Sequence, residues 1–173
     1  MPNRRDPKSN NRECVAVVGT GNYGISLGRS LMASEYNVTY GSRSPNLDYL
    51  KLCFESCAGN YSVASIGQAL LEADKVVFLA IPAWDSVYEN IVDEINRRYE
   101  EFSRRNKPLV LIDISNSLDD TSKSNVSNAE KLNGLVKRSL PNLRISVVKG
   151  FNLLSAYAIG QDRFANKSAL TGG

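Results

Sequence analysis

The sequence predicts an α/β fold, in which helices cover both faces of a doubly wound parallel sheet within a single domain. The chain has 173 residues, which is about the length of one domain. Short apolar runs alternate along it with longer stretches whose apolar residues recur at helical spacing. The most apolar run, Val76–Ile81, has no alternating polar residues, as expected of a parallel strand that is buried on both faces.

The composition excludes several classes of protein. Hydrophobic residues make up 42% and charged residues 23% of the chain, which is typical of a folded globular protein. The net charge of +3 is too small and too scattered to indicate a nucleic-acid partner. No apolar run approaches the ~18 residues of a membrane helix, and the basic start leads into polar residues, so we expect neither a membrane span nor a signal peptide.

The chain has no histidine, so it cannot by itself supply an imidazole base or a histidine-ligated zinc or haem. We therefore expect no metal site. The 3 cysteines, Cys14, Cys53 and Cys57, are odd in number and form no C-x-x-C pair. This pattern favours a reduced, cytosol-facing protein.

Residues 1–12 are polar and charged and are expected to form a flexible N-terminal arm, with one folded domain over 13–173. The run Cys14–Val18 predicts the first buried strand. A helix is expected from about Tyr23 to Glu35. Its apolar residues recur at helical spacing: Leu27, Leu31 and Met32.

Four further elements are predicted before the most apolar run. Val38–Tyr40 is the second strand, and Pro45 opens a second helix, since proline suits the first turn of a helix. Tyr61–Ala64 is a weak third strand. A short helix is expected over Ser65–Ala73.

A long amphipathic helix is predicted after Val76–Ile81. It carries Val87, Ile91 and Ile95 at helical spacing. Its far end, Arg97–Arg105, mixes both signs of charge, which is typical of a solvated face rather than a binding patch.

The last predicted elements are a buried strand, a capped helix and one more strand. Leu109–Ile114 is the buried strand, and a polar loop over Asp119–Asn125 follows it. Ser127–Glu130 has the spacing of a capping box, in which the two end residues satisfy free N–H groups of the helix start. The last strand is Ile145–Val148. The capped helix should direct three apolar residues inward: Ala129, Leu132 and Val136.

Gly19-Thr20-Gly21-Asn22-Tyr23-Gly24 places a G-x-G-x-x-G motif between the first predicted strand and its helix. In that context each glycine has a role: a tight turn, close backbone approach to a pyrophosphate, and close packing of helix on sheet. The helix N-terminus offers N–H groups and the positive end of a dipole to the phosphates. The motif favours a dinucleotide-binding, Rossmann-type fold over a glycine-rich turn of another α/β protein.

The end of the second strand predicts which dinucleotide is bound. An NAD site would carry Asp or Glu about 20 residues after the motif, whereas Tyr40–Ser44 contains no acid. Ser42 can donate a hydrogen bond to a 2′-phosphate, and Arg43 can pair with it through its planar guanidinium. The sequence therefore favours NADPH over NADH, with an ordinary surface arginine as the alternative for Arg43.

Three further turns should meet at the carboxyl edge of the sheet, where doubly wound folds bind their ligands. The first, Leu79–Trp84, could run along the cofactor, with Trp84 either shielding the nicotinamide or packing into the core. The others, Asp113–Asn116 and Lys149–Asn152, supply an amide, small residues and a cation. Either alone would be an ordinary turn, but two on the same edge favour a ligand cleft.

Four segments, in order and with similar spacing, carry a family resemblance: Gly41–Pro45, Asp113–Asn116, Ser127–Glu130 and Val148–Tyr157. They resemble the cytosolic N-terminal oxidoreductase domain of the STEAP metalloreductase family. The resemblance covers roughly Val15 to the C-terminus. A more distant similarity is to the deazaflavin-dependent NADP oxidoreductases of microbes.

The resemblance implies that NADPH gives a hydride to a flavin, expected to be FAD. Electrons would then pass to a haem in a six-helix membrane domain, and from there to ferric or cupric ions. The haem would belong to that membrane domain, which this chain does not contain.

The resemblance also implies a set of cofactor-binding residues. The pyrophosphate would be lined by one group: Thr20, Gly21, Asn22 and Tyr23. The 2′-phosphate would contact Ser42 and Arg43. The rest of the cofactor would be bordered by a third group: Ala80, Ile81, Pro82 and Ala83, with Asn116 and Gly150 near the nicotinamide. Tyr157 stands where the family usually has a tryptophan associated with the flavin.

Other features depart from the family pattern. Pro82–Asp85 replaces a segment that is basic and contains histidine in the family, and no membrane domain follows. The chain stops at Leu170–Gly173, before the closing helix of the sheet, so we expect a fragment or a short form, truncated at its C-terminus. As a fragment it would lie at the cytosolic face of an endosomal or plasma membrane, and otherwise in the cytoplasm. The sequence leaves open whether the chain forms a homo-oligomer.

We expect an NADPH-dependent oxidoreductase domain without a catalytic acid–base residue, because hydride transfer is the cofactor's own chemistry. Three alternatives stay open: a non-catalytic NADPH-binding regulatory module, a stand-alone flavin reductase, and a reductase of a small substrate such as an imine. The last is disfavoured, since the chain lacks the second helical domain that such enzymes use.

Overall fold

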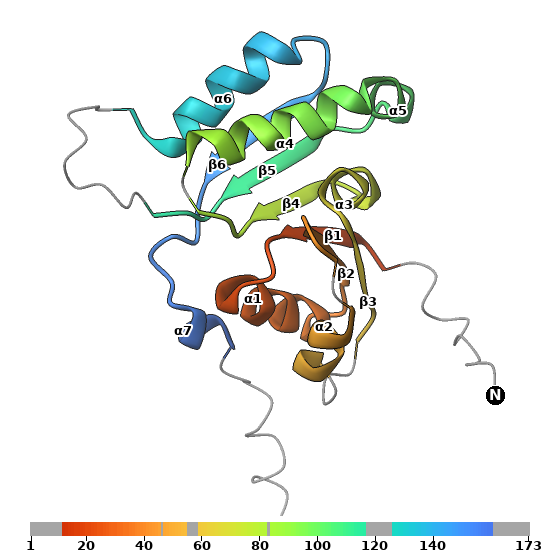
Figure 1. The fold of residues 1–173 in the computed structure, drawn as a ribbon, viewed down its shortest axis with the longest axis vertical. Coiled ribbons are helices and arrows are strands. Elements are labelled where there is room, and N and C mark those ends of the chain that lie inside the picture. The colour runs from red at the N-terminus through yellow and green to blue at the C-terminus, as the bar shows by residue number, and fades with distance from the viewer. Residues whose placement is uncertain (1–11, 46, 55–58, 83, 117–125, 161–173) are drawn as a thin grey trace, which may run out of the picture.

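The structure, a computed structural model, describes residues 12–45, 47–54, 59–82, 84–116 and 126–160. Within these ranges 6 parallel strands form a sheet in the order β3-β2-β1-β4-β5-β6 (Figure 1). The strands are β1 (Cys14–Val18), β2 (Asn37–Ser42), β3 (Tyr61–Ser65), β4 (Val76–Leu79), β5 (Leu109–Asp113) and β6 (Ile145–Lys149). The helices are α1 (Asn22–Ala33), α2 (Leu47–Phe54), α3 (Ile66–Glu72), α4 (Asp85–Arg97), α5 (Tyr99–Arg105), α6 (Asn128–Ser139) and α7 (Ala156–Gly160). The predicted Rossmann-type α/β fold is confirmed.

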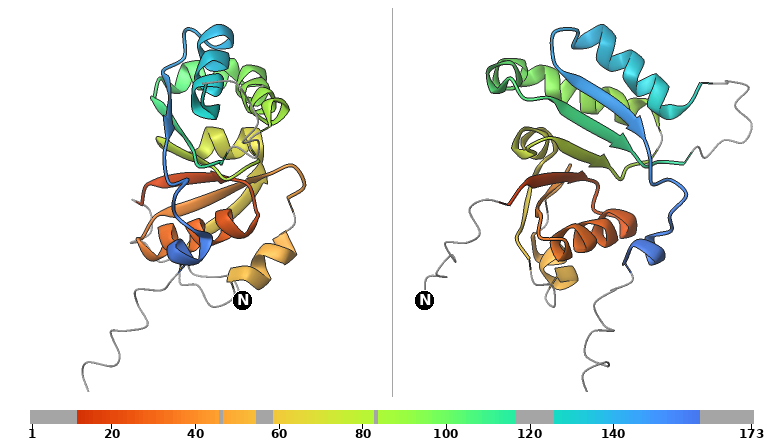
Figure 2. Two further views of the ribbon diagram at one scale, coloured as in Figure 1. Left: turned by 90° about the vertical axis from the view of Figure 1, so that its left-hand side faces the viewer. Right: turned by 180° about the vertical axis from the view of Figure 1, so that it is seen from behind.

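Helices lie on both faces of this sheet (Figures 1 and 2). α1 packs on β1 and β2, and α7 packs against α1. On the other face α3 contacts β1, β2 and β3, and α4 lies between α3 and α6. Across the described ranges, no helix has both the length and the apolarity that a membrane crossing requires.

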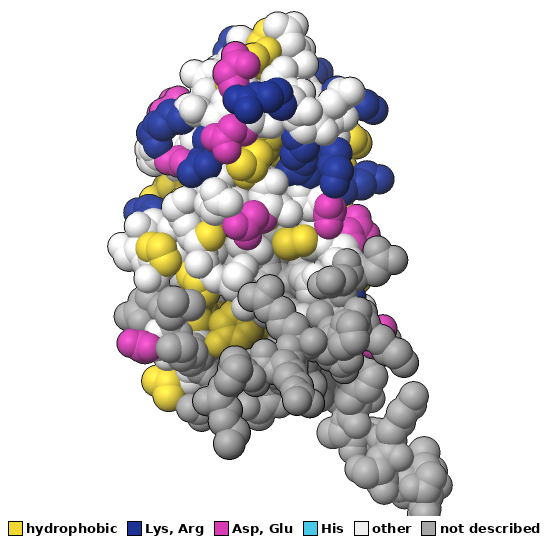
Figure 3. Space-filling model, turned by 90° about the vertical axis from the view of Figure 1, so that its right-hand side faces the viewer, with side chains coloured by type: hydrophobic (Ala, Val, Ile, Leu, Met, Phe, Trp, Pro, Cys, Tyr) yellow, Lys and Arg dark blue, Asp and Glu magenta, His cyan; other side chains and the backbone are white. Residues whose placement is uncertain are grey.

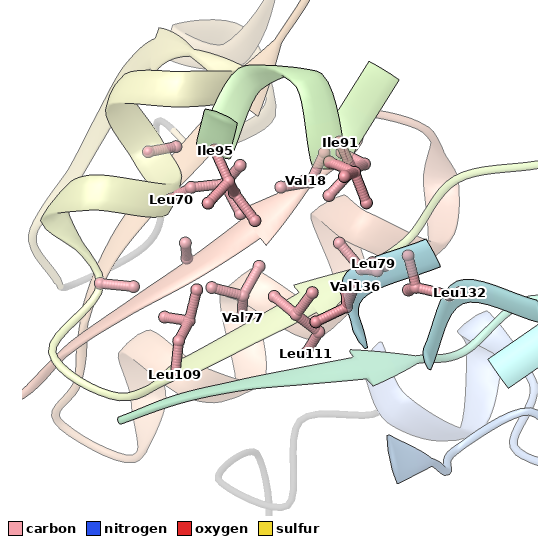
Figure 4. Packing of buried hydrophobic residues seen from close by; sticks show 14 of the residues in the cluster. Val18, Leu70, Val77, Leu79, Ile91, Ile95, Leu109, Leu111, Leu132 and Val136 are labelled. Atoms are coloured by element: carbon pink, nitrogen blue, oxygen red, sulfur yellow. The ribbon is translucent and has the colours of Figure 1, made fainter. Parts of the chain in front are cut away.

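Alternate residues of β1 enter two separate apolar cores. Ala16 and Val18 belong to the core beneath α3, α4 and α6, whereas Val15 and Val17 belong to the core beneath α1. All four are at most 3% exposed. Figure 4 shows the first core, in which side chains of β4 and β5 meet those of α3, α4 and α6. Burial on both faces explains why β1 has no polar alternation.

Two predicted helices end earlier than expected. The first stops at Ala33 and does not reach Glu35, because Glu35 adopts a left-handed backbone with a φ of 67°. The long amphipathic helix breaks at Arg98, whose φ of −111° is not helical, so α4 and α5 are separate. The prediction of one helix continuing through Arg97–Arg105 is wrong.

The other boundaries agree with the predictions or differ from them by at most two residues, as helix and strand ends commonly do. β4 stops at Leu79, so Ala80 and Ile81 belong to the following loop. α2 begins at Leu47 rather than at Pro45, and Ser65 caps α3 instead of belonging to it. The short helix α7 was not predicted.

The capping box of α6 is confirmed. The Ser127 hydroxyl oxygen accepts a hydrogen bond from the Glu130 N–H at 3.3 Å, and the Glu130 carboxylate accepts one from the Ser127 N–H at 2.7 Å. The three residues expected to point inward are buried: Ala129, Leu132 and Val136.

Several predictions fall outside the described residues. They concern residues 1–11 of the N-terminal arm, Cys57, Ala83, the loop Asp119–Asn125 and the end at Leu170–Gly173.

Hydrogen bonds from side chains link the segments at the amino edge of the sheet, where the strands begin. Arg105 donates to the carbonyl oxygens of Leu71 and Asp74, each at 2.7 Å. The Asp74 carboxylate accepts from the Cys14 N–H at 2.8 Å and from Lys107 Nζ at 3.0 Å. Figure 3 shows this side of the molecule, where basic and acidic side chains are interspersed.

We expect Asp74 to make the stability of the fold pH-dependent. The Cys14 N–H, followed by the Lys107 ammonium group, lowers the pKa of the Asp74 carboxyl below its usual range. A lowered folded-state pKa gives stabilisation that is complete above the unfolded-state pKa and is lost as the pH falls through the folded-state pKa. Asp74→Asn should therefore lower the urea midpoint near neutral pH, and the difference from wild type should shrink as the pH falls below the ordinary pKa of an aspartate carboxyl.

The exposed Asp93 on α4 provides the control for this experiment. Asp93→Asn should leave the urea midpoint almost unchanged at each pH. A loss of stability in Asp74→Asn that is the same at neutral and acid pH would contradict the role of the Asp74 charge.

Candidate functional site

The predicted site residues on the loops that follow β1, β2, β4, β5 and β6, among those the structure describes, meet at the carboxyl edge of the sheet, around the point where β1 lies between β2 and β4. The strand order reverses direction there, which is where doubly wound sheets leave a crevice for ligands. The first loop at this point is a turn at Gly19, which has a φ of +113° and donates its N–H to the Gly41 carbonyl at 3.0 Å. A Cβ on Gly19 would lie 2.1 Å from the Ala80 carbonyl oxygen, so the turn requires glycine.

The other two glycines of the motif have different surroundings. A Cβ on the buried Gly24 would lie 2.2 Å from the Gly19 carbonyl oxygen, so this glycine lets α1 pack closely on the turn. A Cβ on the exposed Gly21 would meet no atom within 4 Å. The glycine at position 21 is therefore not required by the fold, and it borders open space above the start of α1.

The start of α1 can accept an anion. Gly21 is the N-cap residue, and no side chain caps the helix there. No residue of the first turn of α1 is acidic. The first N–H groups of the helix, with its positive dipole end, therefore face the open space beside Gly21. Thr20 and Tyr23 are partly exposed and Asn22 is exposed at the same place.

Ser42 and Arg43 lie next to this turn, because β2 pairs with β1 in parallel and Gly41 is level with Val18. Ser42 is the last residue of β2 and is partly exposed, and its hydroxyl oxygen accepts from the Ser44 N–H at 3.3 Å. Arg43 is exposed. The two residues thus lie at the carboxyl edge of the sheet, beside the glycine turn.

The loop after β4 borders the other side of the turn. Ala80 donates its N–H to the Val18 carbonyl at 2.8 Å, and Ala80 and Ile81 are partly exposed while Pro82 is exposed. Trp84 is the N-cap residue of α4 and is 56% exposed. The interpretation that Trp84 packs into the core is therefore wrong.

The ends of β5 and β6 are joined by hydrogen bonds. The Gly150 N–H donates to the Asp113 carbonyl at 3.1 Å, and Asn116 Nδ2 donates to the Asn152 carbonyl at 3.1 Å. Asn116 is exposed, whereas Asp113 is completely buried. The two turns predicted to share one edge are thus adjacent.

One contact links this pair of turns to the glycine motif. The Tyr23 hydroxyl donates to the Phe151 carbonyl at 2.8 Å. Phe151 has a φ of 63°, and its ring packs edge-on against Phe78, with 5.4 Å between the centroids. Tyr157 lies on α7, beside α1, and is 77% exposed.

Sequence reasoning missed one buried polar side chain at this edge, that of Tyr88 on α4. Its hydroxyl lies 3.1 Å from Asp113 Oδ1 and 2.9 Å from the Ser115 hydroxyl. Burial, with the Asp113 charge opposing ionisation, raises the pKa of Tyr88 to about 12. Helical spacing from Ile91 and Ile95 places Tyr88 on the inward face, and a buried tyrosine hydroxyl requires a partner, so a signal was present.

Comparisons with known proteins agree with this geometry. Residues 14–117 match the family described as NADP oxidoreductase, coenzyme F420-dependent. A similar solved structure is that of a proposed F420-dependent NADP reductase from Arthrobacter sp. FB24, with 22% identity and a TM-score of 0.55 over 83% of this chain and 64% of that one. A hypothetical protein from Sinorhizobium meliloti has 23% identity and a TM-score of 0.59 over 87% of this chain and 66% of that one.

An imine reductase from Myxococcus stipitatus in complex with NADP+ is more distant, with 13% identity and a TM-score of 0.52 over 79% of this chain and 39% of that one. Identities this low show a shared fold. The chain spans slightly less than two thirds of the length of the Arthrobacter and Sinorhizobium proteins.

Proposed function

The chain belongs to the family of NADP oxidoreductases described as coenzyme F420-dependent, and from this premise we propose that it binds NADPH across the carboxyl edge of its sheet and passes a hydride to a flavin. The observation that carries the proposal is the uncapped start of α1 beside the open space at Gly21. Both features suit a phosphate group and neither is needed by the fold.

In this proposal the pyrophosphate lies on the start of α1. The backbone N–H groups of Asn22, Tyr23 and Gly24 point along the helix axis toward it, and Thr20 can add its hydroxyl. Gly19 shapes the turn, and Gly21 lets the phosphates approach the backbone closely. The residues present therefore fit a dinucleotide.

The 2′-phosphate of NADPH lies between Ser42 and Arg43 in this proposal. A hydroxyl and a guanidinium are donors that suit a phosphate, and the guanidinium can form two parallel hydrogen bonds with it. Both side chains reach solvent, so they can contact a ligand without being buried first.

The nicotinamide half is proposed to lie between the loop after β4 and the ends of β5 and β6. Ala80, Ile81 and Pro82 would border it on one side, and Asn116 and Gly150 on the other. When bound, NADPH supplies the hydride from its nicotinamide ring and leaves as NADP+, while the flavin gains that hydride and one proton from solvent. The chain's contribution is to orient the ring and to exclude water.

The resemblance to the STEAP family supports a second part of the proposal, in which this reaction is the first step of a longer electron path. We propose FAD as the flavin, beside Tyr157, and reduction of ferric or cupric ions by a haem-containing membrane domain as the role of the whole protein. Because the matched family is named for a deazaflavin coenzyme, a deazaflavin is the competing acceptor. Both acceptors take a hydride at the equivalent position of a flat tricyclic ring.

Stereospecifically 4-deuterated NADPH tests the proposal. With FAD, we expect NADPH oxidation to slow when the transferred hydrogen is deuterium and not when the other C4 hydrogen is. With a 5-deazaflavin the transferred deuterium should stay on carbon and be seen by mass spectrometry, whereas the flavin N–H exchanges with water. The ratio of the rate of NADPH oxidation with FAD to the rate with the 5-deazaflavin identifies the preferred acceptor.

Two results would contradict parts of this proposal. Binding of NADPH in calorimetry without turnover of either acceptor would make the chain a non-catalytic NADPH-binding module. Failure to bind NADPH at millimolar concentration would remove the proposed function altogether.

A further inference from the structure

Four side chains form a polar cluster at the carboxyl edge, here called the edge tetrad: Tyr88, Asp113, Ser115 and Lys149. The first three are buried, and the side chain of Lys149 is 31% exposed. Tyr88 comes from α4, Asp113 ends β5, Ser115 follows it, and Lys149 ends β6. Tyr88 and Asp113 are completely buried, and Ser115 is 7% exposed. The tetrad therefore joins the segments that follow three adjacent strands, β4, β5 and β6.

The hydrogen bonds of the tetrad converge on Asp113. Lys149 Nζ donates to Asp113 Oδ2 at 2.9 Å and also to the Ser115 carbonyl oxygen. Asp113 Oδ1 accepts from the Tyr88 hydroxyl and from the Ser115 N–H, each at 3.1 Å. Tyrosine has one hydroxyl proton, so the 2.9 Å contact between Tyr88 and Ser115 is a bond that the Ser115 hydroxyl donates.

This arrangement leaves little freedom to the backbone around it. A buried carboxylate that loses its cation or its hydrogen bonds is strongly destabilised, so the partners of Asp113 have to stay within reach. Lys149 holds the Ser115 carbonyl, and Asn116 is the next residue along the chain. Lys149 is also bonded directly to Gly150 in the sequence, and the Gly150 N–H donates to the Asp113 carbonyl.

We infer that the edge tetrad is the positioning device of the nicotinamide half of the site. It sets where Asn116 and Gly150 stand relative to the loop after β4, because each of the three segments contributes at least one member. This inference rests on the proposed binding of NADPH at this edge. None of the four residues needs to touch the reacting atoms.

The amide pair of Asn116 and Asn152 supports this role. Asn116 Nδ2 donates to the Asn152 carbonyl at 3.1 Å, and Asn152 Nδ2 lies 3.4 Å from Asn116 Oδ1. Asn116 is exposed and Asn152 is partly exposed, and Asn116 directly follows Ser115 of the tetrad in the sequence. A shift of the backbone by about 1 Å at such a place can slow a reaction about 100-fold.

Binding measurements with two ligands distinguish an effect on the nicotinamide half of the site from an effect on the adenosine half. NADPH contacts both halves, whereas adenosine 2′,5′-bisphosphate lacks the nicotinamide and contacts only the adenosine half. In Tyr88→Phe we expect NADPH to bind about tenfold more weakly, as for the loss of one hydrogen bond, and the bisphosphate to bind as to wild type within about twofold. Hydride transfer to FAD should slow by up to about 100-fold.

Lys149→Met is the stronger variant, and Lys107→Met is its matched control. Lys107 also pairs with an aspartate, at 3.0 Å, but on the opposite edge of the sheet. Lys149→Met should show the same selective loss of NADPH affinity as Tyr88→Phe, and Lys107→Met should bind both ligands as wild type does. If Lys149→Met fails to fold, which urea denaturation shows, Tyr88→Phe carries the test, because it keeps the ring and the other partners of Asp113.

The outcomes distinguish this inference from the proposed function. If the wild-type chain binds both ligands but folded Tyr88→Phe loses affinity for neither, or loses it equally for both, the positioning role is overturned while the proposed function stands. If the wild-type chain binds neither ligand, the proposed function has failed, and the inference with it.

Discussion

Gly21→Ala is expected to weaken NADPH binding about 100-fold and to leave the fold intact. A Cβ at position 21 meets no atom within 4 Å, and the φ of −77° suits alanine. The added methyl group would instead occupy the space through which the pyrophosphate approaches the first N–H groups of α1. Loss of one or two charge-assisted hydrogen bonds is worth about 2–3 kcal/mol, which corresponds to that change in Kd.

Gly24→Ala is the matched comparison on the same helix. Its Cβ would lie 2.2 Å from the Gly19 carbonyl oxygen, inside a packed contact. Overpacking of this kind costs about 1–3 kcal/mol, so this variant should lower the urea midpoint clearly. Gly21→Ala should lose at most about 1 kcal/mol through its poorer N-cap residue. Tight NADPH binding by Gly21→Ala in calorimetry would mean that the phosphates do not lie on this turn.

The strands and the glycine motif could be predicted because their signals are local. The unbroken apolar run at Val76–Ile81 reports burial on both faces, and the spacing of Gly19, Gly21 and Gly24 reports a turn followed at once by a helix. Ser127 and Glu130 predicted a cap for the same reason. In each case the residues that fix the structure are neighbours in the sequence.

The break between α4 and α5 had no such signal. Residues 97–105 are good helix formers, and the break at Arg98 accompanies the burial of Phe102 in the core beneath α3, α4 and α6. Tertiary packing overrides helix propensity there. The edge tetrad could not be predicted in full either. Its residues meet because β4, β5 and β6 lie side by side, and no single segment of the sequence determines that strand order.

Arg43→Ala should weaken the binding of NADPH about 30- to 100-fold and the binding of NADH by less than about twofold. A guanidinium pairs with the 2′-phosphate through charge-assisted hydrogen bonds, and NADH has no phosphate at that position. Because Arg43 is exposed, its removal should not change the urea midpoint. Calorimetry with both nucleotides measures the effect, and added salt should weaken NADPH binding more in the wild type than in the variant.

Arg144→Ala controls for the general loss of a positive charge, since Arg144 is exposed just before β6, at the opposite edge of the sheet. It should bind both nucleotides as the wild type does. Equal weakening of NADPH and NADH by Arg43→Ala would give the arginine a different role, because stacking of a guanidinium on the adenine ring serves both nucleotides alike. Preference for NADPH would then depend on Ser42 and on the absence of an acid in Tyr40–Ser44, and Ser42→Ala, rather than Arg43→Ala, would reduce it.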